Sequence, residues 1–136
     1  MQGLVGAAPI GIQNSELYYY NYLNKNKTKV KAITEIIDTS AISEILLIDY
    51  KAEGNRNAFN EKLIDSCKNI EVPLMLFGGI TEPDQIKRIL RKNKVSAICI
   101  GNSLSYKENK IQEIKKNIIG SKTRSPQFRQ QGKINV

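Results

Sequence analysis

The sequence predicts an α/β fold in which parallel strands alternate with helices. Short, wholly apolar runs recur along the chain, which is typical of strands that are covered on both faces. Longer segments lie between them, and in these segments apolar residues recur at helical spacing. Strict alternation of this kind indicates a parallel sheet with right-handed crossovers. A chain of 136 residues is long enough for one such domain.

The first part of the chain predicts a strand, a hairpin and a helix. Residues 4–10 form a small, apolar run that is consistent with a buried strand. Residues 11–22 predict a hairpin, because Asn14-Ser15 is a turn signal between two alternating arms. From Val30 onward, apolar residues recur at helical spacing, so residues 28–40 predict an amphipathic helix.

The rest of the chain continues the alternation. A proline follows Thr81-Glu82, and this order is typical of a helix start. The predicted elements are, in order, strand 44–48, a charged loop 49–57 with Gly54 as its hinge, a helix around 59–67 capped by Asn57, strand 72–76, a helix beginning at 81–84, strand 96–100 and a helix around 111–118.

Glycine follows two successive strands of this series. Gly78 and Gly79 come after strand 72–76, and Gly101 comes after strand 96–100. Backbone without side chains at the carboxyl ends of strands lets amides approach a phosphate closely, and a following helix start adds a favourable dipole. In (β/α)8 barrels, phosphate commonly binds in the loops after strands seven and eight. The alternative is that these glycines are only tight turns between strand and helix.

The composition excludes several classes of chemistry. The chain has no histidine, which removes the commonest general base and most zinc sites. Cys67 and Cys99 fall in a predicted helix and a predicted strand, where they are expected to be reduced core thiols. No metal or other cofactor is expected. No run of 18 apolar residues and no signal peptide is visible, so the expected compartment is the cytoplasm.

The net charge of +8 is unevenly distributed. Residues 120–136 carry four basic side chains and no acidic one, and the segment is polar, aperiodic and broken by proline and glycine. It is therefore predicted to be a disordered tail. Nucleic acid is not an expected partner, because the tail has one aromatic residue and matches no recognisable module.

Four segments together resemble a known family. They resemble the second half of the barrel of the cyclase subunit of imidazole glycerol phosphate synthase, the HisF family. The resemblance covers residues 3–119 and implies that residues 1–119 are the C-terminal half of a TIM-type (β/α)8 barrel, strands five to eight, with strands one to four missing by truncation. The segments are Glu44-Ile-Leu-Leu, Glu53-Gly54-Asn55, Phe77-Gly78-Gly79 and Ile100-Gly101-Asn102-Ser103.

The resemblance also implies roles for single residues and a set of partners. In the family, a glutaminase (HisH-like) docks at the amino-terminal face of the barrel and supplies ammonia, and the imidazole ring is closed at the opposite face. Self-association or the missing N-terminal half would complete the barrel here. The implied site residues are Gly78, Gly79, Gly101 and Asn102 for a substrate phosphate, Lys51, Glu53 and Gly54 for the mobile loop after strand six, and Glu44 for the ammonia gate.

Three positions depart from the family pattern. Pro9 falls where the family has a catalytic aspartate at the end of strand five, and proline cannot transfer a proton. Lys51 replaces another aspartate, and Phe77 replaces a serine. Phosphate binding is thus better supported than cyclisation. Three alternatives to the cyclase stay open: an ammonia-channelling barrel for glycosyl amidation in surface-polysaccharide synthesis, an inactive fragment, and a phosphate-binding protein of another barrel family.

Overall fold

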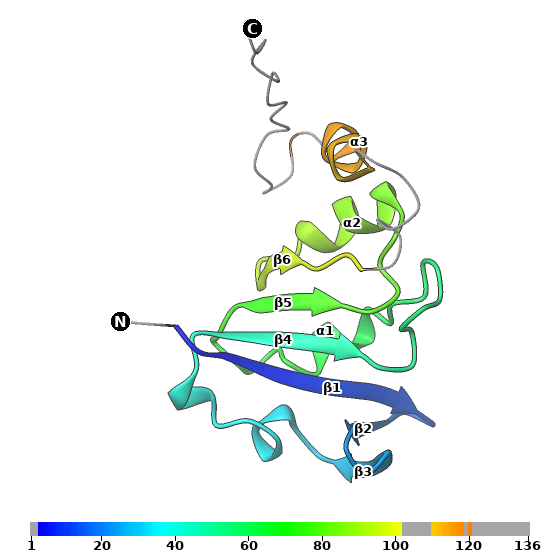
Figure 1. Cartoon of the computed structure of the whole chain (residues 1–136). Helices are drawn as coiled ribbons and strands as arrows, with labels where there is room; N and C mark the ends of the chain where they lie inside the picture. Colours follow the sequence, from blue (N-terminus) through cyan, green and yellow to red (C-terminus); the bar gives the residue numbers. More distant parts are fainter. Residues whose placement is uncertain (1–2, 102–109, 119, 121–136) are drawn as a thin grey trace, which may run out of the picture.

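A computed structural model of the chain describes residues 3–101, 110–118 and 120. Its centre is one six-stranded sheet with the strand order β3-β2-β1-β4-β5-β6 (Figure 1). Asn102 and the predicted basic tail, apart from its first residue Gly120, lie outside the described residues. The strands are β1 (Val5–Gln13), β2 (Glu16–Asn21), β3 (Asn26–Val30), β4 (Glu44–Asp49), β5 (Leu74–Phe77) and β6 (Val95–Ile98).

Four of the strands are parallel, as the alternation predicts. β1 pairs with β4, β4 with β5 and β5 with β6, all in parallel. The chain between these strands forms short 3-10 turns, η1 (Ile33–Glu35) and η2 (Thr39–Ala41), and the helices α1 (Lys62–Asp65) and α2 (Pro83–Leu90); α3 (Lys110–Asn117) follows β6. In the part of the chain that is described, no helix is long and apolar enough to cross a membrane.

The hairpin between β1 and β2 is confirmed at the expected turn. Asn14 and Ser15 have φ angles of 50° and 62°, and both central residues of a two-residue type I′ turn require such positive values. The two strands pair in antiparallel register from Ile10 opposite Tyr19 to Gln13 opposite Glu16.

The helix predicted over 28–40 is wrong. The chain instead forms β3, in which Val30 pairs with Leu17 of β2 and is buried. After β3 it makes one 3-10 turn that buries Ile33 and a second that is capped by the carboxylate of Asp38. Residues 28–37 are rich in Thr, Val and Ile, and β-branching favours extended backbone. Their apolar spacing did identify residues that reach the core.

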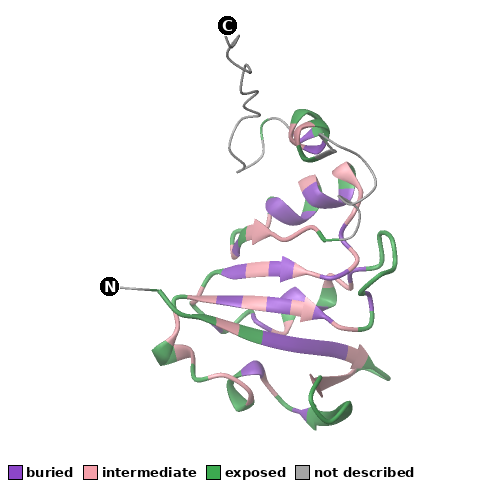
Figure 2. Cartoon of the chain, in the orientation of Figure 1, coloured by how far each residue is buried: buried purple, intermediate pink, exposed green. Residues whose placement is uncertain are grey.

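The helices cover one face of the parallel sheet and bury a single core there. Buried and half-buried residues alternate along β4 (Figure 2). Ile45 and Leu47 belong to this core, while Leu46 and Ile48 are only half-buried. From the helices and turns come Ile33, Leu63, Ile64, Cys67, Ile86, Ile89 and Leu90.

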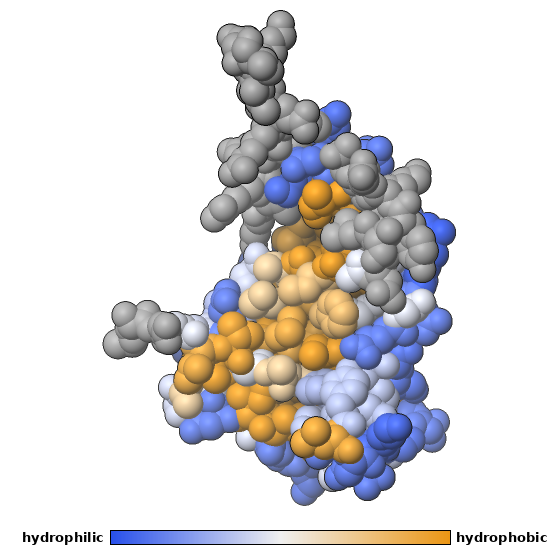
Figure 3. Space-filling view, in the orientation of Figure 1, coloured by the Kyte–Doolittle hydropathy of each residue, from blue (hydrophilic) through white to orange (hydrophobic). Residues whose placement is uncertain are grey.

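The opposite face of the sheet is apolar, and no helix of the described residues covers it. It carries Leu46 and Ile48 of β4 together with Met75 and Phe77 of β5, which are opposite them in the register. All four are half-buried. Figure 3 views this face, and an apolar patch extends through its centre. Parallel strands with helices on one side and an open apolar face on the other are the arrangement of a partial (β/α) barrel.

The structure shortens the predicted helix at 59–67 and corrects its cap. α1 is a single turn, although the expected apolar residues of this segment are buried. Asn57 has a φ of 53° and donates its N–H to Thr81 Oγ1 across the molecule, so it is not a helix cap. The N-cap residue of α1 is Glu61, and just before it Asn60 Oδ1 accepts the N–H of Lys62 at 3.1 Å. α2 begins with proline, as predicted.

Candidate functional site

The glycine turns after β5 and β6 lie at the same edge of the sheet. Gly78 and Gly79 directly follow β5, with φ angles of 106° and 69°. Gly101 lies just beyond β6, and a Cβ on it would be 3.2 Å from the Phe77 ring. Because β5 and β6 are neighbours in parallel register, the structure brings the three glycines together, as the sequence predicts.

The backbone amides of this edge are available. Among the described residues, none accepts a hydrogen bond from the N–H of Gly78, Gly79 or Gly101. Nine-tenths or more of buried amides in folded proteins have a partner, and Gly78 is buried. Unpaired amides at a strand-to-helix turn are groups that an anion can satisfy.

Two of the glycines are also required by the fold itself. A Cβ on Gly78 would lie 2.6 Å from the carbonyl oxygen of Asp49, and one on Gly79 would lie 2.9 Å from the carbonyl oxygen of Ala52. Positive φ angles add a second reason for glycine at both positions. Gly78 and Gly79 therefore serve as tight turns and can also bind an anion, whereas Gly101 has no such backbone constraint.

The loop after β4 is fastened to the glycine turn. Gly79 O accepts the N–H of Ala58 at 2.8 Å, and Thr81 Oγ1 accepts the N–H of Asn57 at 3.0 Å. An exposed ion pair of 2.8 Å joins Arg56 to Glu82. Together these contacts place residues 50–60 against the carboxyl end of β5.

Tyrosines connect the same loop to the hairpin on its other side. The rings of Tyr20 and Tyr50 are stacked, with centroids 4.7 Å apart and an interplanar angle of 15°. Tyr22 packs edge-on against Tyr20 at 5.0 Å and donates its hydroxyl hydrogen bond to Glu53. Burial and this carboxylate raise the pKa of Tyr22 to about 12, so the phenol stays neutral. The signal in the sequence is the two-residue spacing of Tyr20 and Tyr22, which places side chains of an extended chain on the same face.

The remaining residues expected in this loop are Lys51 and Gly54. The ammonium group of Lys51 donates to Ile12 O of β1 at 3.2 Å, so it lies against the hairpin. Gly54 has a φ of 78°, and a Cβ added to it would meet no atom within 4 Å, so a side chain there would be unobstructed. Glu53, Lys51 and Gly54 therefore lie in one loop at the carboxyl end of β4, as the sequence predicts.

Pro9 is buried within β1 at the level of Ile48 of β4. It is the fifth of the nine residues of β1 and lies near the end of the part of β1 that pairs with β4. Tyr50 packs against Gly11 two residues further on. The side chain of Pro9 itself has no ionisable group. This part of the edge can position and pack a ligand, but Pro9 cannot transfer a proton.

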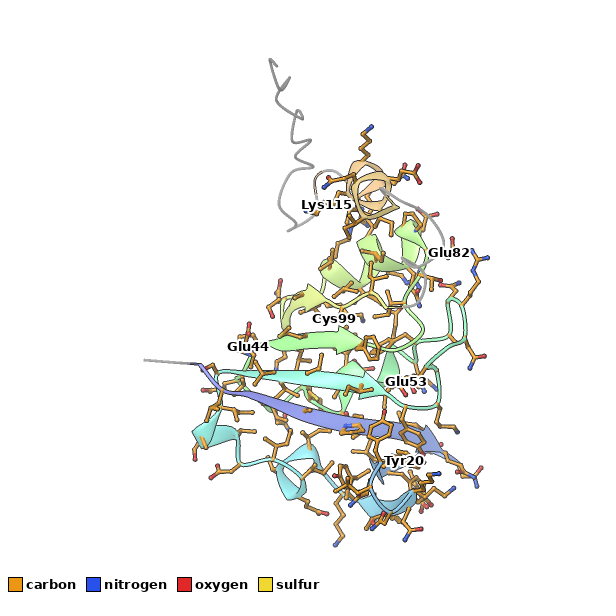
Figure 4. All side chains as sticks on the ribbon, viewed as in Figure 1. Tyr20, Glu44, Glu53, Glu82, Cys99 and Lys115 are labelled. Atoms are coloured by element: carbon orange, nitrogen blue, oxygen red, sulfur yellow. The ribbon has the colours of Figure 1, made fainter. Side chains whose placement is uncertain are left out.

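Glu44 lies at the opposite end of the strands. It begins β4, and Ser96 of β6 donates a hydrogen bond of 3.4 Å to its carboxylate. Figure 4 shows Glu44 at one end of the sheet and Tyr20 and Glu53 at the other. The structure thus separates the expected gate residue from the glycine turns by the length of a strand.

The described residues include no group of three or more cysteine, aspartate or glutamate side chains that could hold a metal ion. Cys67 and Cys99 are free, and burial raises the pKa of both thiols, so both favour the unreactive protonated form.

Comparison with known proteins identifies the family. The model of the family described as "Histidine biosynthesis protein" matches residues 7–110. The chain belongs to this family. The match runs from β1 through the glycine turn after β6, and it confirms the resemblance to HisF and the partial (β/α)-barrel fold.

The similar curated proteins are imidazole glycerol phosphate synthase subunits HisF. The protein from Exiguobacterium sp. is 21% identical over 117 residues, which are 84% of this chain and 45% of the relative. The protein from Methanocaldococcus jannaschii is 26% identical over 100 residues, 71% of this chain and 37% of the relative. The one from Methanococcus vannielii is 22% identical over 102 residues, 73% and 38%. The chain thus spans less than half the length of these relatives.

Proposed function

We propose that this chain is the phosphate-binding half of a HisF-like barrel. Residues 1–119 form the half-barrel in this proposal, and the basic segment 120–136 lies outside it. The completed barrel is the cyclase subunit of imidazole glycerol phosphate synthase, acts on a phosphorylated substrate in the cytoplasm, and receives ammonia from a HisH-like glutaminase at the end where Glu44 lies.

One observation carries the proposal. Three glycines from two neighbouring strands meet at one edge, and their amides have no partner among the described residues. Gly78, Gly79, Gly101 and Asn102 are the residues that we assign to one phosphate group. The loop with Lys51, Glu53 and Gly54 borders this edge and is the part of the chain nearest to the rest of such a ligand.

Adding a negative charge at Gly101 is expected to abolish stabilisation by phosphate. Gly101 is the best position for this test because it is exposed, and the nearest atoms to an added Cβ belong to the Phe77 ring, not to backbone. Gly101→Asp introduces a carboxylate beside the bound anion, whereas Gly101→Asn adds nearly the same volume without charge. The measurement is the melting temperature of each full-length protein in phosphate and in chloride at equal ionic strength.

We expect phosphate to raise the melting temperature of the wild type and of Gly101→Asn, but not of Gly101→Asp. Asn93→Asp controls for net charge, because Asn93 is exposed and lies just before β6, at the opposite end of the strand from Gly101. Equal phosphate responses of the Gly101→Asp and Asn93→Asp proteins would refute the assignment of this edge.

A second candidate function is favoured by Pro9 of β1 and by Lys51 in the loop after β4. Pro9 is buried where a catalytic carboxylate is expected, and the Lys51 side chain is hydrogen-bonded to Ile12 O. A barrel that only passes ammonia onward needs neither the carboxylate that is missing at Pro9 nor the one that is missing at Lys51. The second candidate is therefore an ammonia-channelling partner for amidation of a sugar, with the same phosphate site and the same glutaminase.

Ring closure by the chain alone tests the reason for the second candidate. We expect no turnover of the histidine-pathway substrate when the purified chain is supplied with ammonium salt, because Pro9 offers no carboxylate and no histidine can replace it. Substrate consumption is followed by absorbance, with a bacterial HisF as the positive control. Robust, ammonia-dependent turnover would remove the reason for the second candidate.

A further inference from the structure

We infer that Asp49 is a positioning residue that sets the shape of the phosphate-binding turn through the loop after β4. The inference rests on the proposed function and assigns one residue a part in it. Asp49 is the last residue of β4 and is 3% exposed, which makes it the one buried acidic side chain among the described residues.

The carboxylate of Asp49 holds both ends of the loop. Its Oδ1 accepts the backbone N–H groups of Lys51 at 3.2 Å and of Ala52 at 3.3 Å, and its Oδ2 accepts the N–H of Asn60 at 2.9 Å. A buried carboxylate is costly unless it is hydrogen-bonded, and three amide donors satisfy that need. The side chain therefore fixes where the loop leaves β4 and where it turns toward α1.

The loop held in this way forms the wall behind the two glycines of β5. Ala52 and Phe59 are the residues that approach Gly79 most closely, and a Cβ there would lie 2.9 Å from Ala52 O and 3.0 Å from Phe59 N. Ala52 donates its own N–H to the Asp49 carboxylate, and Phe59 directly precedes Asn60, which does the same. The main-chain carbonyl of Asp49 also abuts Gly78. Loss of the hydrogen bonds to the Asp49 carboxylate would let the loop move away from Gly78 and Gly79, whose amides we assign to the anion.

Charge alone would have the opposite effect on an anion. A carboxylate near bound phosphate repels it, so neutralising Asp49 without any change of shape would strengthen binding. Positioning through the loop instead means that neutralisation weakens binding. The sign of the change distinguishes the two effects.

The test compares Asp49→Asn with the wild type and with Asp38→Asn. Asparagine has nearly the shape of aspartate, but it places an NH2 group or a weaker acceptor against the three amide donors. Asp38 is exposed and caps η2, so its variant controls for the same change in net charge. The probe is sulfate, whose charge is constant across the pH range used, and binding to the full chain is measured by calorimetry below the melting temperature.

We expect Asp49→Asn to bind sulfate about tenfold more weakly than the wild type, the size expected when hydrogen bonds to a charged group are lost. Asp38→Asn should bind as the wild type does. Unchanged or tighter binding by Asp49→Asn would overturn the inference. Absence of sulfate binding by the wild type would instead contradict the proposed function.

The pH profile gives a readout that general destabilisation would not move. Burial raises the pKa of Asp49, and the bonds from Asn60, Lys51 and Ala52 oppose that rise together with the charge of Lys51. Tyr50 is the other titratable group beside it, and Ile10 and Gly78 on the flanking strands are uncharged. As pH falls through this raised pKa, the wild type loses its carboxylate acceptors. Its advantage over Asp49→Asn should then disappear; an advantage that persists unchanged at acidic pH would contradict the inference.

Should Asp49→Asn fail to fold, the wild type still provides the test. The amide resonances of Lys51, Ala52 and Asn60 should titrate together with the Asp49 carboxyl group, and sulfate should shift them along with those of Gly78 and Gly79. Sulfate shifts confined to the glycines would show that the loop is not coupled to the turn.

Discussion

Gly78→Ala is expected to destabilise the protein by about 3 kcal/mol or more, because strain at a positive φ and overpacking act together. The φ of Gly78 is 106°, and the new methyl group would lie 2.6 Å from the carbonyl oxygen of Asp49. That oxygen belongs to the backbone of a central strand, so it cannot move aside cheaply. Total stabilities of domains are about 5–15 kcal/mol, and a loss of this size is a large share. Urea unfolding followed by circular dichroism measures it.

Gly54→Ala is the matched control. Gly54 also has a positive φ, of 78°, but no atom lies within 4 Å of an added Cβ. Its substitution should therefore cost only the backbone term, about 1 kcal/mol. Similar losses for the two variants would show that the close approach of β4 to the glycine turn is not a source of strain.

The strands were predictable because a strand that is covered on both faces appears in the sequence as a continuous apolar run. Glu44–Asp49 and Leu74–Phe77 coincide closely with apolar runs, and the glycines mark the ends of their strands in sequence and structure alike. The hairpin was predictable from Asn14-Ser15, since few residue pairs adopt positive φ angles readily.

The segment after the hairpin was not predictable from spacing. Residues 28–37 have apolar residues at helical intervals, yet strand pairing with β2 decides the conformation of Val30, and β-branching opposes a helix. Tertiary pairing outweighed the local pattern here. The short α1 shows the converse, in that the buried residues were predicted and the length of the helix was not.

The candidate site was predictable in position but not in its supporting contacts. Gly78, Gly79 and Gly101 were found from the ends of strands, which parallel topology brings together. Asp49 was missed, because its importance lies in three amide donors from residues 51, 52 and 60 whose approach depends on the loop. The stack of Tyr20 on Tyr50 likewise joins residues from two separate elements.

The chain is expected to associate with a second copy of itself in solution. The face of the sheet opposite the helices, here called the inner face, carries Leu46, Ile48, Met75 and Phe77, and no helix in the described part of the chain covers it. Burial of apolar surface drives association. Both edges of the parallel part of the sheet also have unpaired backbone groups. Within the described residues, the hairpin pairs with β1 only from Ile10 onward, and β6 has β5 as its one neighbour. Two such halves together supply the eight parallel strands of a closed barrel.

A charge placed on the inner face should prevent this association. Met75→Glu puts a carboxylate at the centre of the face, where closing the barrel would bury it without a partner. Thr34→Glu adds the same charge at an exposed position of η1, on the side that the helices cover. We expect the first variant to be monomeric and the second to associate as the wild type does.

Sedimentation equilibrium of the full chain at micromolar concentrations tests the half-barrel most directly. The monomer mass is 15.3 kDa, and the account requires a species of about twice that mass or more. A protein that stays at the monomer mass over the whole concentration range, and binds no hydrophobic dye, would contradict it, because the inner face of the sheet would then need neither a partner nor protection from water.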